Sequence, residues 1–189
     1  MQAMMISERK QARLFSVQNL VKMALCIAFC CVSAFISFPL PFTPGLVTAL
    51  TVALTVTALV LPPQLTFITV AAYVLLGAIG LPVFPGGMGG LGRLFGPTGG
   101  FYLGWPFVCF IESLLKGSKV SFRRYAIVAV TAGVPLTYVG GLISMMYVQQ
   151  VGLFEGLVMA VFPFIPGDIM KALLAAFIAE RVNRMLVRR

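Results

Sequence analysis

The chain has 189 residues, of which 60% are hydrophobic and only 10% are charged, and its formal net charge is +9. A soluble globular domain carries about 25% charged residues, and a fold of this size could not bury so much apolar surface in water. We therefore expect an all-α integral membrane protein, with lipid as the solvent of most of the chain. The basic residues lie at the ends of apolar runs rather than in an aromatic-rich patch, which argues against nucleic-acid binding.

The N-terminal segment is polar and basic, and an apolar run follows it directly. A secretory signal peptide has the same order, but this run exceeds the usual apolar region of such a peptide and no convincing cleavage site follows it. We predict that the run is retained as the first helix. The prolines and the glycine of FPLPFTPG end this helix, and a Pro-Pro pair ends the second apolar run before the third begins.

The second half of the chain continues the alternation of apolar runs and breaks. A glycine-rich stretch, residues 82–100, is predicted to be an external loop after the third helix, and the basic segment KGSKVSFRRY follows the fourth. After the fifth helix, GLVMAVFPFI fits a short re-entrant or interfacial helix, and PGD opens the last helix. In a single transmembrane domain of residues 1–189, the predicted helices span residues 21–38, 46–61, 65–81, 101–115, 126–147 and 167–186.

Orientation follows from the enrichment of Lys and Arg in cytoplasmic segments of membrane proteins. Of the 14 Lys and Arg residues, all but Arg93 and Lys171 lie at the N-terminal end, in the loop after the fourth apolar run, or in the C-terminal tail. Six helices place these three regions on one face, whereas five or seven would place a basic region outside. We predict six transmembrane helices with cytoplasmic N- and C-termini, in a multi-pass protein of the cell membrane.

Two basic residues, Arg93 and Lys171, lie outside the three basic regions, and one acid, Asp168, lies near the start of the last predicted helix. The predicted topology brings all three to the outer face, and ionisable groups within a membrane usually mark a functional site or a structural bridge. Asp168 and Lys171 are three residues apart, so they share a helix face and can pair, with Asp168 in the first turn. The alternatives are that Asp168 only caps its helix and that Arg93 is a plain loop residue.

The three charges suit a small ligand that carries a carboxylate and a polar head. Arginine offers a planar fork to a carboxylate, and aspartate accepts N–H bonds. Nearby aromatic residues could form the apolar walls of such a site, although each could instead anchor the chain at the lipid interface. These residues are Phe84, Phe95, Tyr102, Trp105 and Tyr147.

Other polar residues have structural interpretations. Thr48, Thr51 and Thr55 recur on one face of the predicted second helix, where hydroxyls bond the carbonyl one turn back. Glu112 precedes Lys116 by four residues, which predicts a local ion pair.

The sequence contains no enzyme constellation. It has no histidine, which excludes Ser-His and His-metal sites, and no GxxxxGK[ST] loop for nucleotide. The four cysteines lie in apolar stretches, which favours helix packing over a metal site or disulfides. We predict a protein that is not an enzyme and that holds no cofactor or metal of its own.

GLPVFPGGMGGLGRLFGPTGG (residues 80–100), the following FYLGW and the later PGDIMK resemble the BioY family across essentially the whole chain. The resemblance implies six membrane helices and the biotin-binding component of an energy-coupling factor transporter, which captures biotin from outside. It also implies partners, namely a transmembrane coupling protein and two ATP-binding-cassette ATPases that bind the ATP. Ala24 and Ala28 match the family's alanine-x-x-x-alanine pattern on helix one, which meets the coupling protein.

Biotin fits the charged residues that stand out. We place its carboxylate at Arg93 and its ureido head at Asp168 and Lys171, with the reversed pose as an open alternative. The resemblance extends the predicted site to Thr98 of the GPTGG block, with Tyr102, Phe84 and Tyr147 as further binding residues. A stand-alone secondary carrier for a small carboxylate-bearing vitamin is the alternative function, although no clear repeat of the type common in carriers is found.

Overall fold

The computed structural model describes residues 15–39, 41 and 43–187. Several residues of the predicted basic ends therefore lie outside the described residues: Arg9, Lys10, Arg13, Arg188 and Arg189. The described elements are α2 (Val17–Phe35), β1 (Ser37–Pro39), β2 (Leu46–Thr48), α3 (Leu50–Val60), α4 (Pro63–Ala78), α5 (Leu91–Leu94), α6 (Gly99–Leu115), α7 (Phe122–Val128), the π-helical turn η1 (Ala129–Gly133), α8 (Val134–Gln149), α9 (Leu153–Ala160) and α10 (Ile165–Val187).

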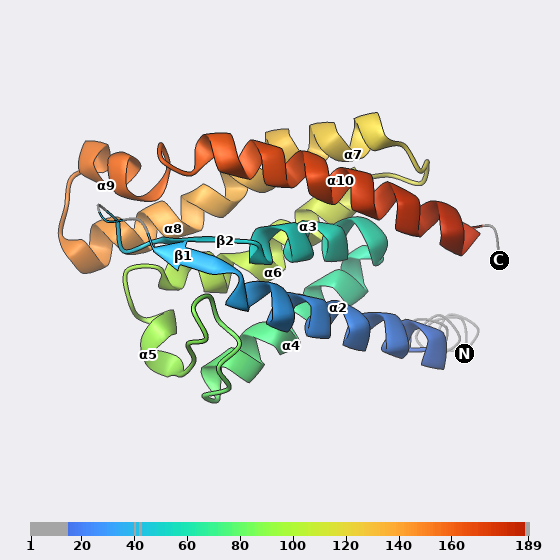
Figure 1. Ribbon diagram of the computed structural model, residues 1–189, viewed down its shortest axis with the longest axis horizontal. Helices are drawn as coiled ribbons and strands as arrows, with labels where there is room; N and C mark the ends of the chain where they lie inside the picture. The colour runs from blue at the N-terminus through green and yellow to red at the C-terminus, as the bar shows by residue number, and fades with distance from the viewer. Residues whose placement is uncertain (1–14, 40, 42, 188–189) are drawn as a thin grey trace, which may run out of the picture.

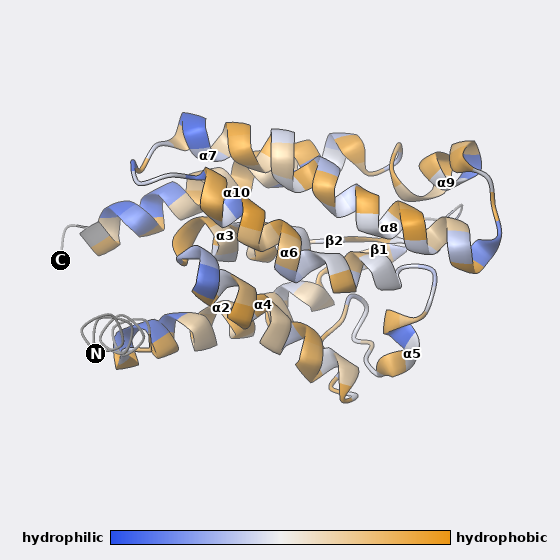
Figure 2. Cartoon of the chain, turned by 180° about the vertical axis from the view of Figure 1, so that it is seen from behind, coloured by the Kyte–Doolittle hydropathy of each residue, from blue (hydrophilic) through white to orange (hydrophobic). Residues whose placement is uncertain are grey.

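The helices form an elongated bundle (Figure 1). The start of α2, the end of α10 and the α6–α7 connection lie together at one end, which we call the basic end because Lys22, Lys116, Lys119 and Arg184 lie on these segments. The helices α5 and α9 lie at the opposite end. Hydrophilic residues concentrate at the two ends of the bundle, whereas its middle is apolar (Figure 2). The fold is thus mostly helical and apolar, in agreement with the predicted class.

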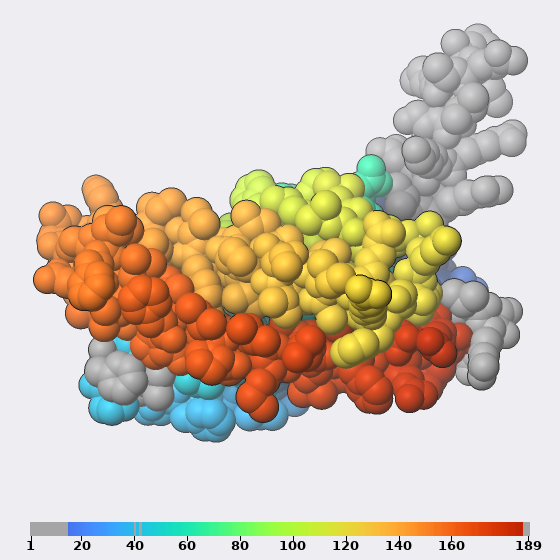
Figure 3. Space-filling model, turned by 90° about the horizontal axis from the view of Figure 1, so that it is seen from above, coloured from blue at the N-terminus to red at the C-terminus, as the bar shows by residue number. Residues whose placement is uncertain are grey.

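Two described helices are long and apolar enough to cross a membrane, Val17–Phe35 and the continuous Phe122–Gln149. The helices α9 and α10, bent by 49° at their junction, make a third candidate if they count as one span. Seen from above, α8, α9 and α10 form one continuous face of the molecule (Figure 3). The remaining apolar helices, α3, α4 and α6, are shorter.

The second apolar run begins as a strand rather than as a helix. Leu46–Thr48 pairs antiparallel with Ser37–Pro39, so α3 has only 11 residues. At 1.5 Å per residue this helix is about 16 Å long, roughly half of a bilayer core. Non-helical backbone is tolerated at such depth where it is buried in protein or lines a cavity. The prediction that Thr48 lies on a helix is therefore wrong, and its Oγ1 instead accepts from Leu50 N at 3.1 Å.

The predicted ion pair between Glu112 and Lys116 is also wrong. The Lys116 ammonium instead donates to the carbonyl oxygens of Ala58, at 2.9 Å, and Leu61. These carbonyls end α3, and the Pro-Pro pair that follows has no N–H to donate, so a cation satisfies them. Glu112 is 2% exposed, and its Oε1 has no hydrogen-bond partner among the described residues. It lies against Gly133 of the π-helical turn.

Small residues let the helices approach closely. On α10, four alanines are buried, and this helix packs along α3: Ala172, Ala175, Ala176 and Ala179. Between α6 and α8, the backbones of Gly100 and Gly140 meet. The buried Cys30 and Cys109 lie in the core among α2, α3, α4 and α6, and all four cysteines are free.

Replacing Gly100 by Ala should destabilise the protein by about 1–3 kcal/mol, because the new methyl group would overlap the carbonyl of Gly140. Gly104, one turn further on the same helix, has open space at the corresponding position. Gly104→Ala should therefore leave stability unchanged or raise it by up to about 1 kcal/mol. Thermal unfolding, followed by the increase in reaction with a thiol-specific fluorophore as the buried Cys30 and Cys109 become accessible, measures both. Equal melting temperatures for the two variants would contradict the close helix approach.

Candidate functional site

A cavity opens between the β1–β2 hairpin, the glycine-rich segment and the helices α6, α8 and α10. Its empty space, including the open mouth, is about 720 Å³. Its lining is mainly apolar and aromatic, and it includes Arg93, Asp168 and Lys171. Three charged residues that are far apart in the sequence thus come to one cavity, as the sequence predicts.

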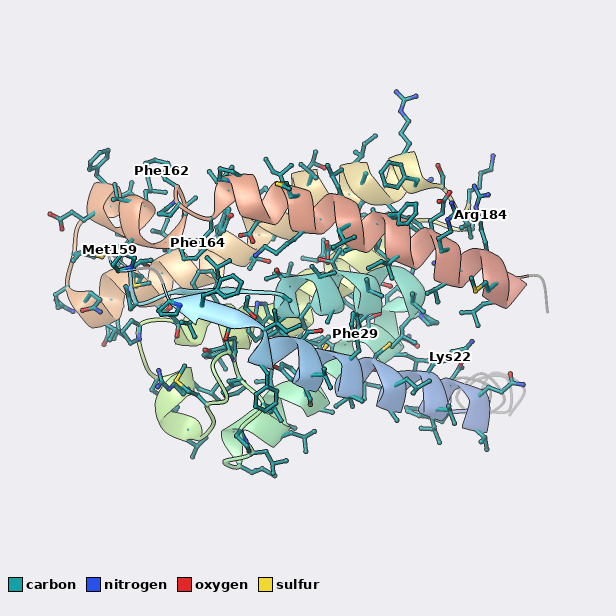
Figure 4. All side chains as sticks on the ribbon, in the orientation of Figure 1. Lys22, Phe29, Met159, Phe162, Phe164 and Arg184 are labelled. Carbon is teal, nitrogen blue, oxygen red and sulfur yellow. The ribbon has the colours of Figure 1, made fainter. Side chains whose placement is uncertain are left out.

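The hairpin closes one side of this cavity. Its connecting segment is tied to the end of α9, because Thr43 Oγ1 donates to the carbonyl oxygen of Met159 at 2.5 Å. The same hydroxyl accepts from Gly45 N at 3.1 Å. The Phe164 ring lies between α10 and the hairpin, whereas Phe162 points outward (Figure 4). Both Gly45 and Phe164 line the cavity, so the hairpin and the start of α10 form a single wall.

Asp168 and Lys171 form the predicted ion pair, with 2.5 Å between Oδ1 and Nζ. The pair is largely enclosed, with side-chain exposures of 14% for Asp168 and 18% for Lys171. Tyr138 Oη on α8 donates to the other carboxylate oxygen at 2.7 Å, and Lys171 Nζ donates to the carbonyl of Thr48 at 3.2 Å. Asp168 is in the first turn of α10, where the helix dipole favours a negative charge. The carboxylate is therefore held in one orientation from three sides.

Arg93 differs from this pair because no acidic residue in the described part of the chain forms an ion pair with it. It lies on the short helix α5 in the glycine-rich segment, and its side chain is exposed at the cavity. Among the described residues, the ion pairs join Lys171 to Asp168 and Arg184 to Glu180. An exposed, unpaired guanidinium at a cavity mouth suits the carboxylate of a ligand.

Packed aromatic rings form one wall of the cavity. Tyr102 stacks on Phe84 with 4.5 Å between ring centroids, and it forms a T-shaped pair with Trp105 with 4.9 Å between ring centroids. Phe84 is fully buried behind Tyr102 and supports it without lining the cavity. Trp105 Nε1 is buried and has no partner among the described residues, although Trp105 lines the cavity. A ligand acceptor placed there would satisfy this indole N–H.

The predicted site residues divide into those at the cavity and those away from it. Thr98 and Tyr102 line it. Tyr147 does not, since it is 78% exposed near the end of α8. Phe95 is likewise exposed and outside the lining. A surface aromatic at a helix end fits the alternative interpretation, an anchor at the lipid interface.

Sequence reasoning missed several lining residues. Tyr138 lies within an apolar run, where nothing in the sequence marks it, and it reaches Asp168 through the packing of α8 beside α10. Thr48 and Thr51, interpreted as structural hydroxyls, line the cavity from the hairpin and from the start of α3. Helical periodicity could not place Thr48, because Thr48 is in a strand, whereas Thr51 lies on a helix as expected.

The cavity therefore combines a fixed carboxylate–ammonium pair, an unpaired guanidinium and an aromatic wall. A carboxylate held by Tyr138 and Lys171 can accept N–H bonds from a neutral polar head. The guanidinium of Arg93 can bind an anionic group, and the rings can enclose an apolar body between the two. This arrangement suits binding of an elongated molecule with one acidic end.

The chain is similar to known proteins along most of its length. The BioY family profile matches residues 6–188. The biotin transporter BioY of Thermotoga maritima is 36% identical over 174 residues, covering 92% of this chain and 100% of that protein. The probable biotin transporter BioY of Bacillus subtilis is 30% identical over 149 residues, covering 78% and 80% of the two chains.

A solved structure is similar to this chain in its fold. The crystal structure of the S-component for biotin from an ECF-type ABC transporter is similar with a TM-score of 0.81 and 29% sequence identity. The similarity covers 89% of this chain and 92% of that one. Because the profile spans nearly the whole sequence, this chain belongs to the BioY family.

Proposed function

We propose that this chain is a biotin-binding membrane subunit that captures biotin from outside the cell for uptake. It acts as a binding and transport component and not as an enzyme. ATPase partner subunits supply the energy and bind the ATP, together with a transmembrane coupling protein. The observation that carries the proposal is the Asp168–Lys171 pair facing an aromatic cavity with Arg93 at its edge.

The pose with the biotin carboxylate at Arg93 has the better electrostatic support. The charge of Lys171 is already neutralised by Asp168, whereas Arg93 has no acidic partner among the described residues. Asp168 would repel a carboxylate, but it would accept hydrogen bonds from the ureido N–H groups. Thr98 and Tyr102 line the cavity and would contact the ligand, with Phe84 supporting Tyr102 from behind.

Direct binding tests the proposed function. The purified full-length protein should bind tritiated biotin saturably, and unlabelled biotin should compete whereas a vitamin without a ureido ring should not. The alternative of a stand-alone carrier is tested in proteoliposomes that lack ATPase partners. Biotin accumulation driven by an ion gradient there would favour the carrier, and absence of biotin binding would overturn the proposal.

We also propose six membrane crossings, with both termini and the α6–α7 connection on the cytoplasmic side of the cell membrane. This orientation is supported because these segments lie at the same end of the bundle (Figure 1) and carry basic residues, which are enriched on the cytoplasmic side. The short helices α3, α4 and α6 would complete their crossings together with the non-helical segments that flank them.

Cysteine labelling should show this orientation. Ser118 lies in the α6–α7 connection, and Gly92 lies in α5 at the opposite end. A membrane-impermeant thiol reagent should label Ser118→Cys only in inverted vesicles and Gly92→Cys only in intact cells, because each position faces one side. The reverse pattern would contradict the proposed topology.

Ala24 and Ala28 form the proposed contact with the coupling protein. Both are exposed on α2 and lie one helical turn apart, so they present a small-residue surface on which another helix can pack closely. Replacing both by Leu should abolish copurification with the coupling protein, while biotin binding by the isolated chain stays unchanged. Copurification at the level of the unsubstituted protein would contradict this contact.

A further inference from the structure

A second cavity lies at the basic end of the bundle, away from the proposed biotin site. Its empty space, including the open mouth, is about 730 Å³, and α2, the α3–α4 connection, the α6–α7 connection and α10 line it. Its lining includes Lys22 and Lys116, and none of the described lining residues is acidic. Two basic side chains thus line one space in which no described residue supplies a carboxylate.

The hydrogen bonds around this cavity leave donors available. Lys116 uses two of its N–H groups on the carbonyls of Ala58 and Leu61, and an ammonium has three. Tyr125 Oη accepts from Asn183 Nδ2 at 2.9 Å, so its own O–H remains able to donate. A site with positive charge and spare donors suits an oxyanion with several acceptor oxygens.

The surroundings of the cavity favour an anion that comes from the membrane. Lys22 is on α2, and its side chain is labelled near the start of that helix in Figure 4. Leu20 and Val21, its neighbours on α2, are 46% and 52% exposed, and Leu186 on the rim is 40% exposed. Apolar side chains beside a basic pocket at a helix end match the boundary between acyl chains and headgroups.

We propose that this cavity binds the headgroup phosphate of an anionic glycerophospholipid. The phosphate would lie between Lys22 and Lys116, with the Tyr125 hydroxyl as a further donor, and the acyl chains would lie against the exposed apolar side chains of Leu20 and Val21. A zwitterionic lipid would bind less well, because its choline group would add a positive charge beside the two lysines.

Native mass spectrometry of the full-length protein with phosphatidylglycerol and phosphatidylcholine tests the proposal. Phosphatidylglycerol should be retained preferentially, and Lys22→Gln should weaken its binding about fivefold, since a basic residue near an anionic lipid contributes about 1 kcal/mol. Lys22 makes no hydrogen bond that the fold depends on among the described residues, so this variant should fold. Lys22→Gln combined with Lys116→Gln should weaken binding about 25-fold.

The matched control is Lys119→Gln, because Lys119 is exposed on the same connection and does not line the cavity. This variant should retain phosphatidylglycerol fully, and biotin binding should be equal in all of these proteins. Equal retention of the two lipids, or undiminished binding in Lys22→Gln, would overturn the proposal. Displacement of phosphatidylglycerol by millimolar inorganic phosphate would also overturn it, since the site would then take a soluble anion.

Discussion

Replacing Asp168 by Asn should lower the affinity for biotin by at least about 100-fold. The carboxylate is the proposed acceptor for the ureido N–H groups, and each hydrogen bond to a charged group contributes about 1.5–3 kcal/mol. The substitution also leaves the ammonium of Lys171 without its counter-charge in a largely enclosed place. Titration calorimetry or binding of tritiated biotin measures the loss.

The control for this experiment is Glu155→Gln. Glu155 is exposed at the start of α9, where Oε2 accepts from Gly152 N at 3.2 Å, and glutamine can make the same capping bond. This variant should bind biotin like the unsubstituted protein. If Asp168→Asn also kept full affinity while remaining folded, Asp168 would not be a ligand of biotin.

Replacing Arg93 by Gln should lower the affinity for biotin about 10- to 100-fold and leave the affinity for biotinamide nearly unchanged. The guanidinium of Arg93 is the proposed partner of the biotin carboxylate, and a charge-assisted bond to it is lost in the variant. Biotinamide has no carboxylate, so it has no such bond to lose. Competition binding with both ligands measures the difference.

The same experiment separates the two poses. In the reversed pose, the carboxylate would lie at Lys171, and Arg93→Gln would affect biotin and biotinamide equally. Arg123→Gln is the matched control, because Arg123 is an exposed arginine that does not line the cavity. It should bind both ligands normally.

The charged part of the site could be predicted because membrane proteins rarely place ionisable residues away from the cytoplasmic side without a reason. Arg93, Asp168 and Lys171 departed from an otherwise regular pattern, and the three-residue spacing of the last two indicated their pairing. Periodicity could not predict the β1–β2 hairpin. Its residues are apolar like a helix of the same composition, and their pairing depends on the prolines and glycine between the strands.

Contacts between helices that are distant in the chain also could not be predicted from the sequence. Tyr138 and Tyr147 are both aromatic residues of α8, yet Tyr138 reaches Asp168 and Tyr147 is exposed. Their difference depends on how α8 is rotated against α10. The spacing of Glu112 and Lys116 is compatible with an ion pair, but in the structure Lys116 instead donates to carbonyls at the end of α3.

The π-helical turn η1 sets that rotation. An α-helix advances by about 100° per residue, so the extra residue of a π turn changes the angular phase of everything that follows it. Deleting one residue from this turn and restoring regular α-helix would turn α8 by about 100° relative to α7 and carry Tyr138 away from Asp168. In evolutionary terms, a single inserted codon in a plain helix would be enough to bring the hydroxyl of Tyr138 to Asp168.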